Sequence, residues 1–255
     1  MISLFNVLYH ERRVLSTAFP FYLAMTAAEF SSCDRLPSTP AWMACHFSCY
    51  GTGLSNIPET LPKGAMLILN DRTPVYGHDA GLIVAQLTQM AEQWQLDSIL
   101  LDFQRHNNQE TAIIARAIAE ALPCPVGVSD SYAETLSCPV FLPPPPLHCP
   151  ISEYLAPWNG RDLWLEAALG NQTISVTESG SQYGPVLPGE DIQPCFEEPQ
   201  LLCHYRITLS QTQADFTLFR TREDLNALLQ AAEALGVTKA VGLYQELGIT
   251  DTNAE

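Results

Sequence analysis

The middle of the chain alternates short apolar runs with amphipathic stretches. Residues 64–71 (GAMLILND) form a near-continuous apolar run that ends in polar residues, as strands buried on both faces do. From Asp79 onward the apolar residues recur at the spacing of a helix, at Ile83, Leu87, Met90 and Trp94. Residues 97–103 (DSILLDF) are the next apolar run. The pattern therefore predicts a strand, a helix and a second strand.

A second helix and a third strand complete this unit. Asn107 lies three residues before Glu110, a spacing typical of a helix capping box. The helix that follows has an apolar stripe at Ile113, Ile114, Ala117 and Ile118. Residues 124–130 (CPVGVSD) are then predicted to be a strand. Short links between alternating strands and helices favour parallel pairing with right-handed crossovers, so 66–69 should lie parallel to 99–102.

The same alternation returns at the C-terminus. Thr221 is predicted to cap a helix that ends at Gly236 and carries Leu225, Leu228, Leu229, Ala232 and Leu235. Residues 239–248 (KAVGLYQELG) are predicted to be a strand. If the sheet closes into a barrel, residues 240–244 must pair with the first strand.

The remaining segments are less regular. The four prolines at 143–146 cannot continue a central strand and must leave the sheet as polyproline II. They are interpreted as a stiff loop at a strand end, in preference to a ligand for a proline-recognition domain. Residues 180–200 are interpreted as a long loop rich in proline and glycine. Further strands are predicted at 42–50, 162–169, 172–179, 201–209 and 214–221.

About eight strands are thus predicted, with helices after only some of them. This favours an α/β fold of the imperfect (β/α)8 TIM-barrel type over an open doubly wound sheet, in a single domain over residues 1–255. No glycine-rich nucleotide loop of the G-x-G-x-x-G or G-x-x-x-x-G-K-[ST] type follows an early strand, which weakens a nucleotide-binding alternative.

Composition narrows the possible partners. Asp and Glu number 28 against 12 Lys and Arg, giving a net charge of −16 that repels phosphate backbones and anionic membranes. We therefore expect neither nucleic-acid nor membrane binding. In residues 1–16 the arginines follow the apolar run, the reverse of a secretory signal, so a cytoplasmic location is expected. The sequence does not determine the oligomeric state.

Polar residues gather where the predicted strands end. They are Asp71, Asp102, Gln104, Arg105, Asp130, Glu166, Glu178 and the run Tyr244-Gln245-Glu246. In a TIM barrel these strand ends form the functional face. Carboxylates and amides beside flat aromatic rings suit sugars, and the aromatic candidates are Trp42, Trp158, Trp164 and Tyr244.

One strand end resembles a known catalytic motif. Residues 97–104 (DSILLDFQ) are similar to the pattern Asp-Gly-x-Asp-x-Asp-x-Glu that glycoside hydrolase family 18, the chitinase-like barrels, carries on its fourth strand. Residues 240–248 (AVGLYQELG) are similar to the last strand of that family, where a large aromatic residue, here Tyr244, floors the sugar site. The resemblance implies a barrel with a glycan site at its strand ends.

Two departures from the motif bear on catalysis. In the family, the last Glu is the general acid and the Asp two residues before it orients the N-acetyl group of the substrate. This chain keeps that Asp as Asp102 but has Gln104 in place of the acid, and Leu100 replaces the middle Asp. An amide does not deliver a proton, and general acid catalysis typically contributes roughly 10²–10⁴-fold. The resemblance therefore implies a pseudoenzyme with no catalytic residue.

The leading hypothesis is a non-catalytic barrel that binds a glycan or glycopeptide fragment through Asp71, Asp102, Gln104, Arg105, Glu166 and Tyr244. One alternative is an active glycosidase with Asp102 and Glu166 as a rearranged pair, separated by about 5–5.5 Å if retaining or about 6.5–9.5 Å if inverting. Another is a protein-interaction scaffold whose mouth is filled by its own loops.

Each site residue also has a structural interpretation. Asp102 and Arg105 are equally well explained as an ion pair at the rim. Glu166 is explained by hydrogen bonding at a strand end, and Glu178 by a turn. His78, His106 and His148 would have to meet at the mouth to hold a metal, and their spacing gives no support for it. We expect no metal and no cofactor.

The eight cysteines lack any C-x-x-C pair, and several lie in apolar runs. In a reducing cytosol they are expected to be small buried hydrophobic residues. Titration of the denatured protein with a thiol reagent, without reductant, should therefore recover all eight thiols. Recovery of fewer than eight would indicate disulfides and a location outside the cytoplasm.

Overall fold

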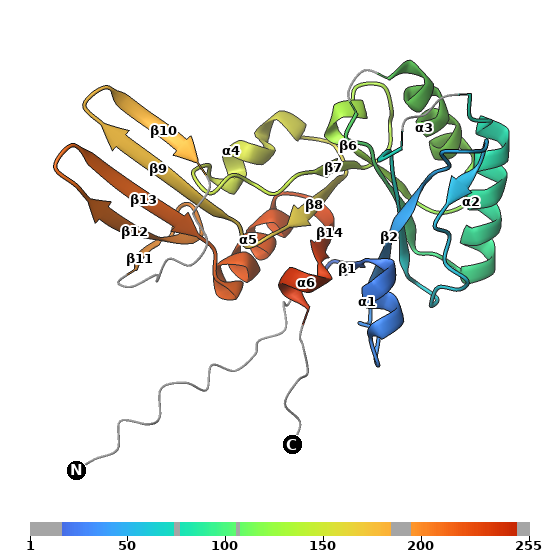
Figure 1. Ribbon diagram of the computed structural model, residues 1–255, viewed down its shortest axis with the longest axis horizontal. Coiled ribbons are helices and arrows are strands. Elements are labelled where there is room, and N and C mark those ends of the chain that lie inside the picture. Colours follow the sequence, from blue (N-terminus) through green and yellow to red (C-terminus); the bar gives the residue numbers. More distant parts are fainter. Residues whose placement is uncertain (1–16, 74–76, 106–107, 185–194, 249–255) are drawn as a thin grey trace, which may run out of the picture.

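The computed structural model describes residues 17–73, 77–105, 108–184 and 195–248. Eight parallel strands form a closed barrel (Figure 1). Around the barrel their order is β1, β14, β8, β7, β6, β5, β4 and β2, and β2 pairs again with β1. They are β1 (Phe21–Met25), β2 (Pro40–Phe47), β4 (Met66–Asn70), β5 (Ser98–Asp102), β6 (Val126–Ser129), β7 (Val140–Leu142), β8 (Leu163–Ala167) and β14 (Val237–Leu243).

The predicted strand–helix–strand–helix–strand unit is confirmed. Strands β4, β5 and β6 are parallel neighbours, with Met66 to Asn70 paired in register with Ser98 to Asp102. Helices α2 (Ala80–Trp94) and α3 (Gln109–Ala121) cover them on the outside (Figure 1). Counted from β1 along the chain, β5 is the fourth strand of the barrel. The Asp102 motif thus occupies the strand on which the resemblance expects it.

Two details of α3 correct the prediction. Asn108 is the N-cap, since its side chain accepts hydrogen bonds from the backbone N–H groups of Glu110 and Thr111. The predicted cap, Asn107, lies outside the described residues. The helix therefore starts one residue later than predicted, and Ile113 is 58% exposed while Thr111 is buried.

The other connections are less regular, as an imperfect barrel implies. The six-residue α1 (Ala27–Ser32) follows β1, and the two-residue β3 (Leu54–Ser55) pairs antiparallel with the end of β2. The 3-10 turn η1 (Asp130–Tyr132) follows β6. After β7 come α4 (Ile151–Leu155) and the 3-10 turn η2 (Ala156–Trp158). Helix α5 (Arg222–Ala234) precedes β14. Its N-cap is Thr221, as predicted, and Asp224 completes a capping box with it.

The last strand is shorter than predicted. β14 pairs with β1 from Ala240 to Leu243, which confirms closure, but residues 244–247 form the helical turn α6 (Tyr244–Leu247). The turn packs tightly on the strand, because a Cβ on Gly242 would lie 2.4 Å from Leu247 Cδ1. The apolar run extends through both elements, and its residue pattern alone does not mark where the strand ends.

A second sheet is inserted between β8 and α5. Its five antiparallel strands lie in the order β10 (Gly180–Gly184), β9 (Asn171–Thr177), β13 (Gln213–Phe219), β12 (Cys203–Leu209) and β11 (Phe196–Glu198). The predicted strands at 172–179, 201–209 and 214–221 belong to this sheet, and the barrel takes its first two strands from residues 21–47. In Figure 1 the sheet extends from the barrel on the side of β7 and β8, away from α2 and α3.

The interior of the barrel is filled mainly in its N-terminal half. The buried side chains that face inward form one cluster: Tyr22, Ala24, Ala41, Met66, Ile68, Leu100, Phe141, Trp164 and Val241. Trp164 is the largest, and a Cβ on Gly127 would lie 2.4 Å from its ring. Glycine at 127 therefore gives the indole the space it occupies.

A cation lies beside this indole. Lys239 forms an ion pair with Asp97, and its Nζ is 5.0 Å from the ring centre of Trp164 and 5.6 Å from that of Tyr22. The lysine side chain is 12% exposed. Burial by itself would raise the pKa of Asp97, but hydrogen bonds from Lys239 and Tyr22 bring it below its ordinary value. Asp97 thus neutralises the charge that Lys239 places inside the barrel.

All eight cysteines are free thiols. Burial raises the pKa of Cys45 to about 12 and that of Cys203 to about 11, so these two are unreactive near neutral pH. Among the described residues, none of the helices is both long and apolar enough to span a membrane.

We predict that Asp97→Asn lowers the free energy of unfolding by about 2 kcal/mol at pH 7, because it leaves Lys239 buried without its counter-charge. Urea unfolding measures this loss. Since the pKa of Asp97 is lowered by folding, its contribution is complete above its ordinary pKa and disappears as the pH falls through the lowered value. The difference between the two proteins should therefore shrink in strong acid.

The double variant Asp97→Asn/Lys239→Met is the control. It removes both charges, so it should recover part of the stability that the single variant loses. Equal stability of wild type and Asp97→Asn at pH 7 would show that the ion pair contributes nothing.

Candidate functional site

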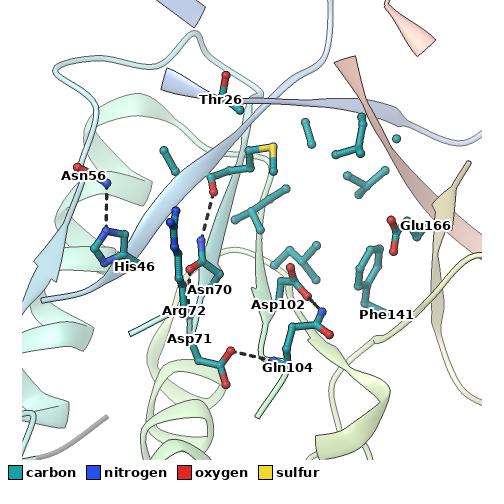
Figure 2. Close-up of a pocket in the computed structure, with 18 of the residues that line it drawn as sticks. Thr26, His46, Asn56, Asn70, Asp71, Arg72, Asp102, Gln104, Phe141 and Glu166 are labelled. Carbon is teal, nitrogen blue, oxygen red and sulfur yellow. Dashed lines mark hydrogen bonds between the residues drawn. The ribbon is translucent and has the colours of Figure 1, made fainter. Parts of the chain in front are cut away.

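A cavity of about 670 Å³ lies over the C-terminal ends of the barrel strands. Figure 2 shows Glu166 and Phe141 on one side, His46, Asn56 and Arg72 on the other, and Asp102 and Gln104 between them. Its size is that of a typical small-ligand site. The lining residues are Ala24, Thr26, Met43, Ala44, His46, Asn56, Ile68, Asn70, Asp71, Arg72, Leu100, Asp102, Gln104, Arg105, Phe141, Glu166, Val241, Gly242 and Leu243.

The floor of the cavity is apolar and its rim is polar. Leu100, Ile68 and Val241 belong to the buried cluster inside the barrel and also line the cavity from below. Alternation along β5 places Asp102 on the same face as Leu100, at the open end of the strand. Among the residues that the structure describes, the mouth is thus hollow.

Asp102 and Gln104 form a pair at the centre of the mouth. Gln104 Nε2 donates a hydrogen bond to Asp102 Oδ1 at 2.5 Å (Figure 2). Burial raises the pKa of Asp102, the hydrogen bond from Gln104 opposes the rise, and the charge of Asp71 adds to it. The amide carbonyl of Gln104 is left to accept and its second N–H to donate.

Asp71 shapes the rim. Its buried carboxylate accepts hydrogen bonds from the backbone N–H groups of Gln104 and Arg105, both at 2.9 Å. Arg105 also donates hydrogen bonds to this segment, from Nε to the carbonyl of Asp71 and from Nη2 to the carbonyl of Arg72. Both acceptors are backbone carbonyls, so these contacts differ from the ion pair between Arg105 and Asp102 that was one interpretation of the sequence. Asp71 and Arg105 therefore position Gln104.

Glu166 faces the mouth from β8. It lines the cavity together with Asp102. Burial raises the pKa of Glu166, and the negative charges of Asp102 and Glu246 raise it further. Glu246 accepts a hydrogen bond from the backbone N–H of Leu169 at 2.8 Å. The mouth thus holds carboxyl groups that resist simultaneous ionisation.

Tyr244 does not join these residues. It begins α6, its phenol oxygen lies 3.5 Å from Cys33 Sγ, and it is not among the residues that line the cavity. Of the proposed tryptophan platforms, Trp164 lies inside the barrel and Trp42 packs edge-on against Phe30. Trp158 lies in η2, and the aromatic residue that lines the cavity is Phe141.

The remaining sequence candidates lie elsewhere. Glu178 is in the turn between β9 and β10, as the structural interpretation expected. Asp130 lines a small recess of about 60 Å³ beside Asp102 and Glu166. His148 lies against Tyr183 of the second sheet, with ring centres 4.8 Å apart, and His106 lies outside the described residues. Within the described ranges, no group of three side chains is arranged to hold a metal ion.

The residues of the opposite wall of the mouth were not predicted from the sequence. His46 Nδ1 is 2.7 Å from the carbonyl oxygen of Phe47, so this nitrogen carries the proton and Nε2 accepts from Asn56 Nδ2 at 3.0 Å. Asn70 donates to the carbonyls of Met43 and Cys45, where the register of β2 shifts. Asn70, the last residue of β4, was recognisable as a polar strand end; His46 and Asn56 required knowledge of the β2–β3 pairing.

The comparisons with known proteins concern the fold. No protein-family model matches the sequence, and no curated protein matches it. Among solved structures, a mutant family 18 chitinase from Cycas revoluta in complex with (GlcNAc)4 is similar with a TM-score of 0.56 at 10% identity, over 88% of this chain and 94% of that one. A chitinase from Chromobacterium violaceum has a TM-score of 0.51 at 8% identity, over 92% and 96%.

The spore cortex-lytic enzyme SleL from Bacillus cereus is similar with a TM-score of 0.50 at 9% identity, over 88% of this chain and 70% of that one. These similarities confirm the TIM-barrel fold. Sequence identities this low are evidence for a shared fold alone.

We predict that Glu166 titrates above its ordinary pKa and that Asp102→Asn lowers the titration midpoint of Glu166. The variant removes one of the two negative charges that raise this pKa and leaves the burial in place. Carboxyl ¹³C NMR over a pH series measures the midpoint. Asp215→Asn in the second sheet is the matched control and should leave Glu166 unchanged. An unchanged Glu166 midpoint in Asp102→Asn would show that the two carboxylates do not interact.

Proposed function

We propose that the barrel binds a glycan or glycopeptide fragment in its mouth without hydrolysing it. The observation that carries this proposal is the Asp102–Gln104 pair, because an amide stands two residues after Asp102 and is fixed to it by a hydrogen bond. In the motif that this strand end resembles, that position belongs to the acid that protonates the leaving oxygen. Gln104 offers hydrogen bonds to a sugar hydroxyl, but no proton for transfer.

The rest of the mouth supports binding. Carboxylate and amide oxygens at Asp102, Glu166 and Gln104 match the hydroxyl donors of a sugar, and Phe141 offers an aromatic surface beside them. The volume of about 670 Å³ accommodates a small ligand. The similar Cycas revoluta chitinase is in complex with (GlcNAc)4, which makes N-acetylglucosamine oligomers the first ligands to test.

The second candidate is a glycosidase in which Asp102 and Glu166 act as the carboxyl pair. The observation in its favour is that both carboxyl groups line the cavity and both have raised pKa values, the property required of a general acid near neutral pH. Against it, no described cation or amide holds Glu166 in a fixed orientation comparable with the Asp102–Gln104 contact.

We predict no turnover of N-acetylglucosamine tetramers by the wild-type protein, measured by chromatography of the products, and saturable binding of the same oligomer by calorimetry. Asp102→Ala should weaken binding about tenfold, because it removes a charged hydrogen-bond acceptor. Gln104→Glu should restore little hydrolysis, since Leu100 leaves Asp102 without the partner that the motif has there.

Glu166→Gln distinguishes the two candidates. Hydrolysis by the wild type that this variant abolishes would establish the glycosidase and refute the binding proposal. If there is neither turnover nor binding of glycans, the proposal fails as a whole.

A further inference from the structure

A second groove lies at the junction of the barrel and the antiparallel sheet. It has a volume of about 430 Å³. The loop after β7 forms one wall with Pro144 to Leu147, Tyr183 of β10 lies on the other side, and the side chain of Arg220 also lines the groove. Arg220 follows β13 and precedes the N-cap of α5.

Arg220 is buried, and among the described residues it has no ion-pair partner. The residue is 4% exposed. Its Nη1 donates to the carbonyl of Pro145 at 2.9 Å, whereas Nε and Nη2 have no hydrogen-bond partner among the described residues. The nearby carboxylate of Asp224 is engaged by Thr221 and His204. Burying a guanidinium in this way is costly, so the unpaired groups require an explanation.

The unpaired atoms are chemically specific. Nε and Nη2 form the side edge of the guanidinium, which presents two parallel N–H groups at the spacing of the two oxygens of a carboxylate. Proline supplies no N–H group, so the adjacent wall at 144–146 presents ring surfaces and carbonyls. Tyr183 is 59% exposed and packs against His148 with its ring tilted by 39°. The groove therefore pairs one anion-binding edge with apolar and aromatic walls.

The groove and the mouth are lined by neighbouring residues of the same two chain segments. Pro143 lines the small recess beside Asp102 and Glu166, and the next residue, Pro144, lines the groove. On β8 the relation is similar, since Glu166 faces the mouth and Ala168, two residues later, lines the groove. A ligand held in the mouth and extended over the ends of β7 and β8 would reach Arg220.

We propose that this groove binds the carboxylate of the ligand whose sugar occupies the mouth, through the Nε and Nη2 edge of Arg220. The inference rests on the proposed function and narrows it to glycans or glycopeptides that carry a carboxylate. Nε and Nη2 are covered in the empty groove. Binding therefore requires the wall at 144–147 to move. One hydrogen bond, from Arg220 Nη1 to the carbonyl of Pro145, joins this wall to the guanidinium.

The test compares N-acetylmuramic acid with N-acetylglucosamine by calorimetry at low salt. The first sugar is the second with a lactyl ether, which carries the carboxylate, on its 3-oxygen. The wild type should bind the acidic sugar at least about tenfold more tightly, as expected for a charge-assisted bidentate contact. Arg220→Gln should abolish this preference and leave the affinity for the neutral sugar unchanged. Arg220→Lys should keep only part of it, because an ammonium group lacks the fork.

Arg116→Gln is the matched control. It removes the same charge from α3 on the far side of the barrel and should leave the preference intact. A wild type without preference, or a preference that survives Arg220→Gln, would overturn the proposal. Inorganic phosphate that binds in an Arg220-dependent manner while the acidic sugar does not would also overturn it, in favour of a phosphate site.

Two further measurements separate the outcomes. If neither sugar binds, the protein is titrated with sodium lactate and the ¹⁵Nε signal of Arg220 is followed. A saturable shift would support carboxylate binding in the groove and show that only the proposed function failed. The absence of a shift would overturn carboxylate binding in the groove as well. Thermal unfolding without ligand tests a purely structural role. Arg220→Gln should not lower Tm, because it removes a buried charge that has no ion-pair partner among the described residues. A large decrease in Tm with no effect of lactate on the wild type would overturn the proposal.

Discussion

The interior of an eight-stranded barrel must be filled by side chains, and in this chain Trp164 fills its N-terminal half. Glycine at 127 makes room for the indole, and Lys239 lies across its face. The charge of that lysine is tolerated there because Asp97 neutralises it. Toward the C-terminal ends, smaller side chains such as Ala24 and Val241 leave the barrel open. The depth of the cavity is therefore a consequence of how the bulky groups are distributed along the barrel axis.

Above this floor, the shape of the mouth depends on one buried carboxylate. Asp71 binds the backbone N–H groups of Gln104 and Arg105, so it fixes the chain as it leaves β5. This role requires a carboxylate at the strand end whether or not the barrel catalyses a reaction. An acidic residue at the mouth of a barrel is thus weak evidence for catalysis until its partners are known. All three carboxylates, Asp71, Asp102 and Glu166, line the cavity, but the carboxylate of Asp71 already accepts two backbone hydrogen bonds.

The sequence predicts the parts of the fold whose pattern is local. The unit at 64–130 and the cap at Thr221 follow from apolar periods and capping residues a few positions apart. The sheet to which a strand belongs cannot be predicted from local pattern. Residues 172–179 alternate as any half-buried strand does, and this alternation does not indicate which strands pair with them. Tyr244 was misplaced for a related reason, because the apolar run continues from β14 into α6 without a change in composition.

The site was predictable where a strand end carries the chemistry, and not where pairing between distant segments creates it. Asp102 ends β5 and Gln104 follows two positions later, so the alternation of the strand, continued past its end, predicted both in the mouth. His46 and Asn56 meet only because β3 folds back on β2. Arg220 was not a candidate, because a single arginine between a strand and a helix shows neither its burial nor its missing partners.

The distribution of charge between the two hollows sets a direction for any ligand that spans them. The mouth contains Asp102 and Glu166, with Asp71 and Glu246 close enough to raise their pKa values. An anionic group placed there would meet like charges, whereas sugar hydroxyls would meet acceptors. The groove beyond Pro143 has the opposite preference, because its charged residue is a guanidinium whose Nε and Nη2 have no hydrogen-bond partner among the described residues. A ligand with a neutral sugar at one end and a carboxylate at the other therefore has one favourable orientation, with the sugar over Leu100 and the carboxylate at Arg220. Leu100 contributes to this orientation, because an aspartate in its place would add a further negative charge beneath the sugar and raise the cost of ionising Asp102.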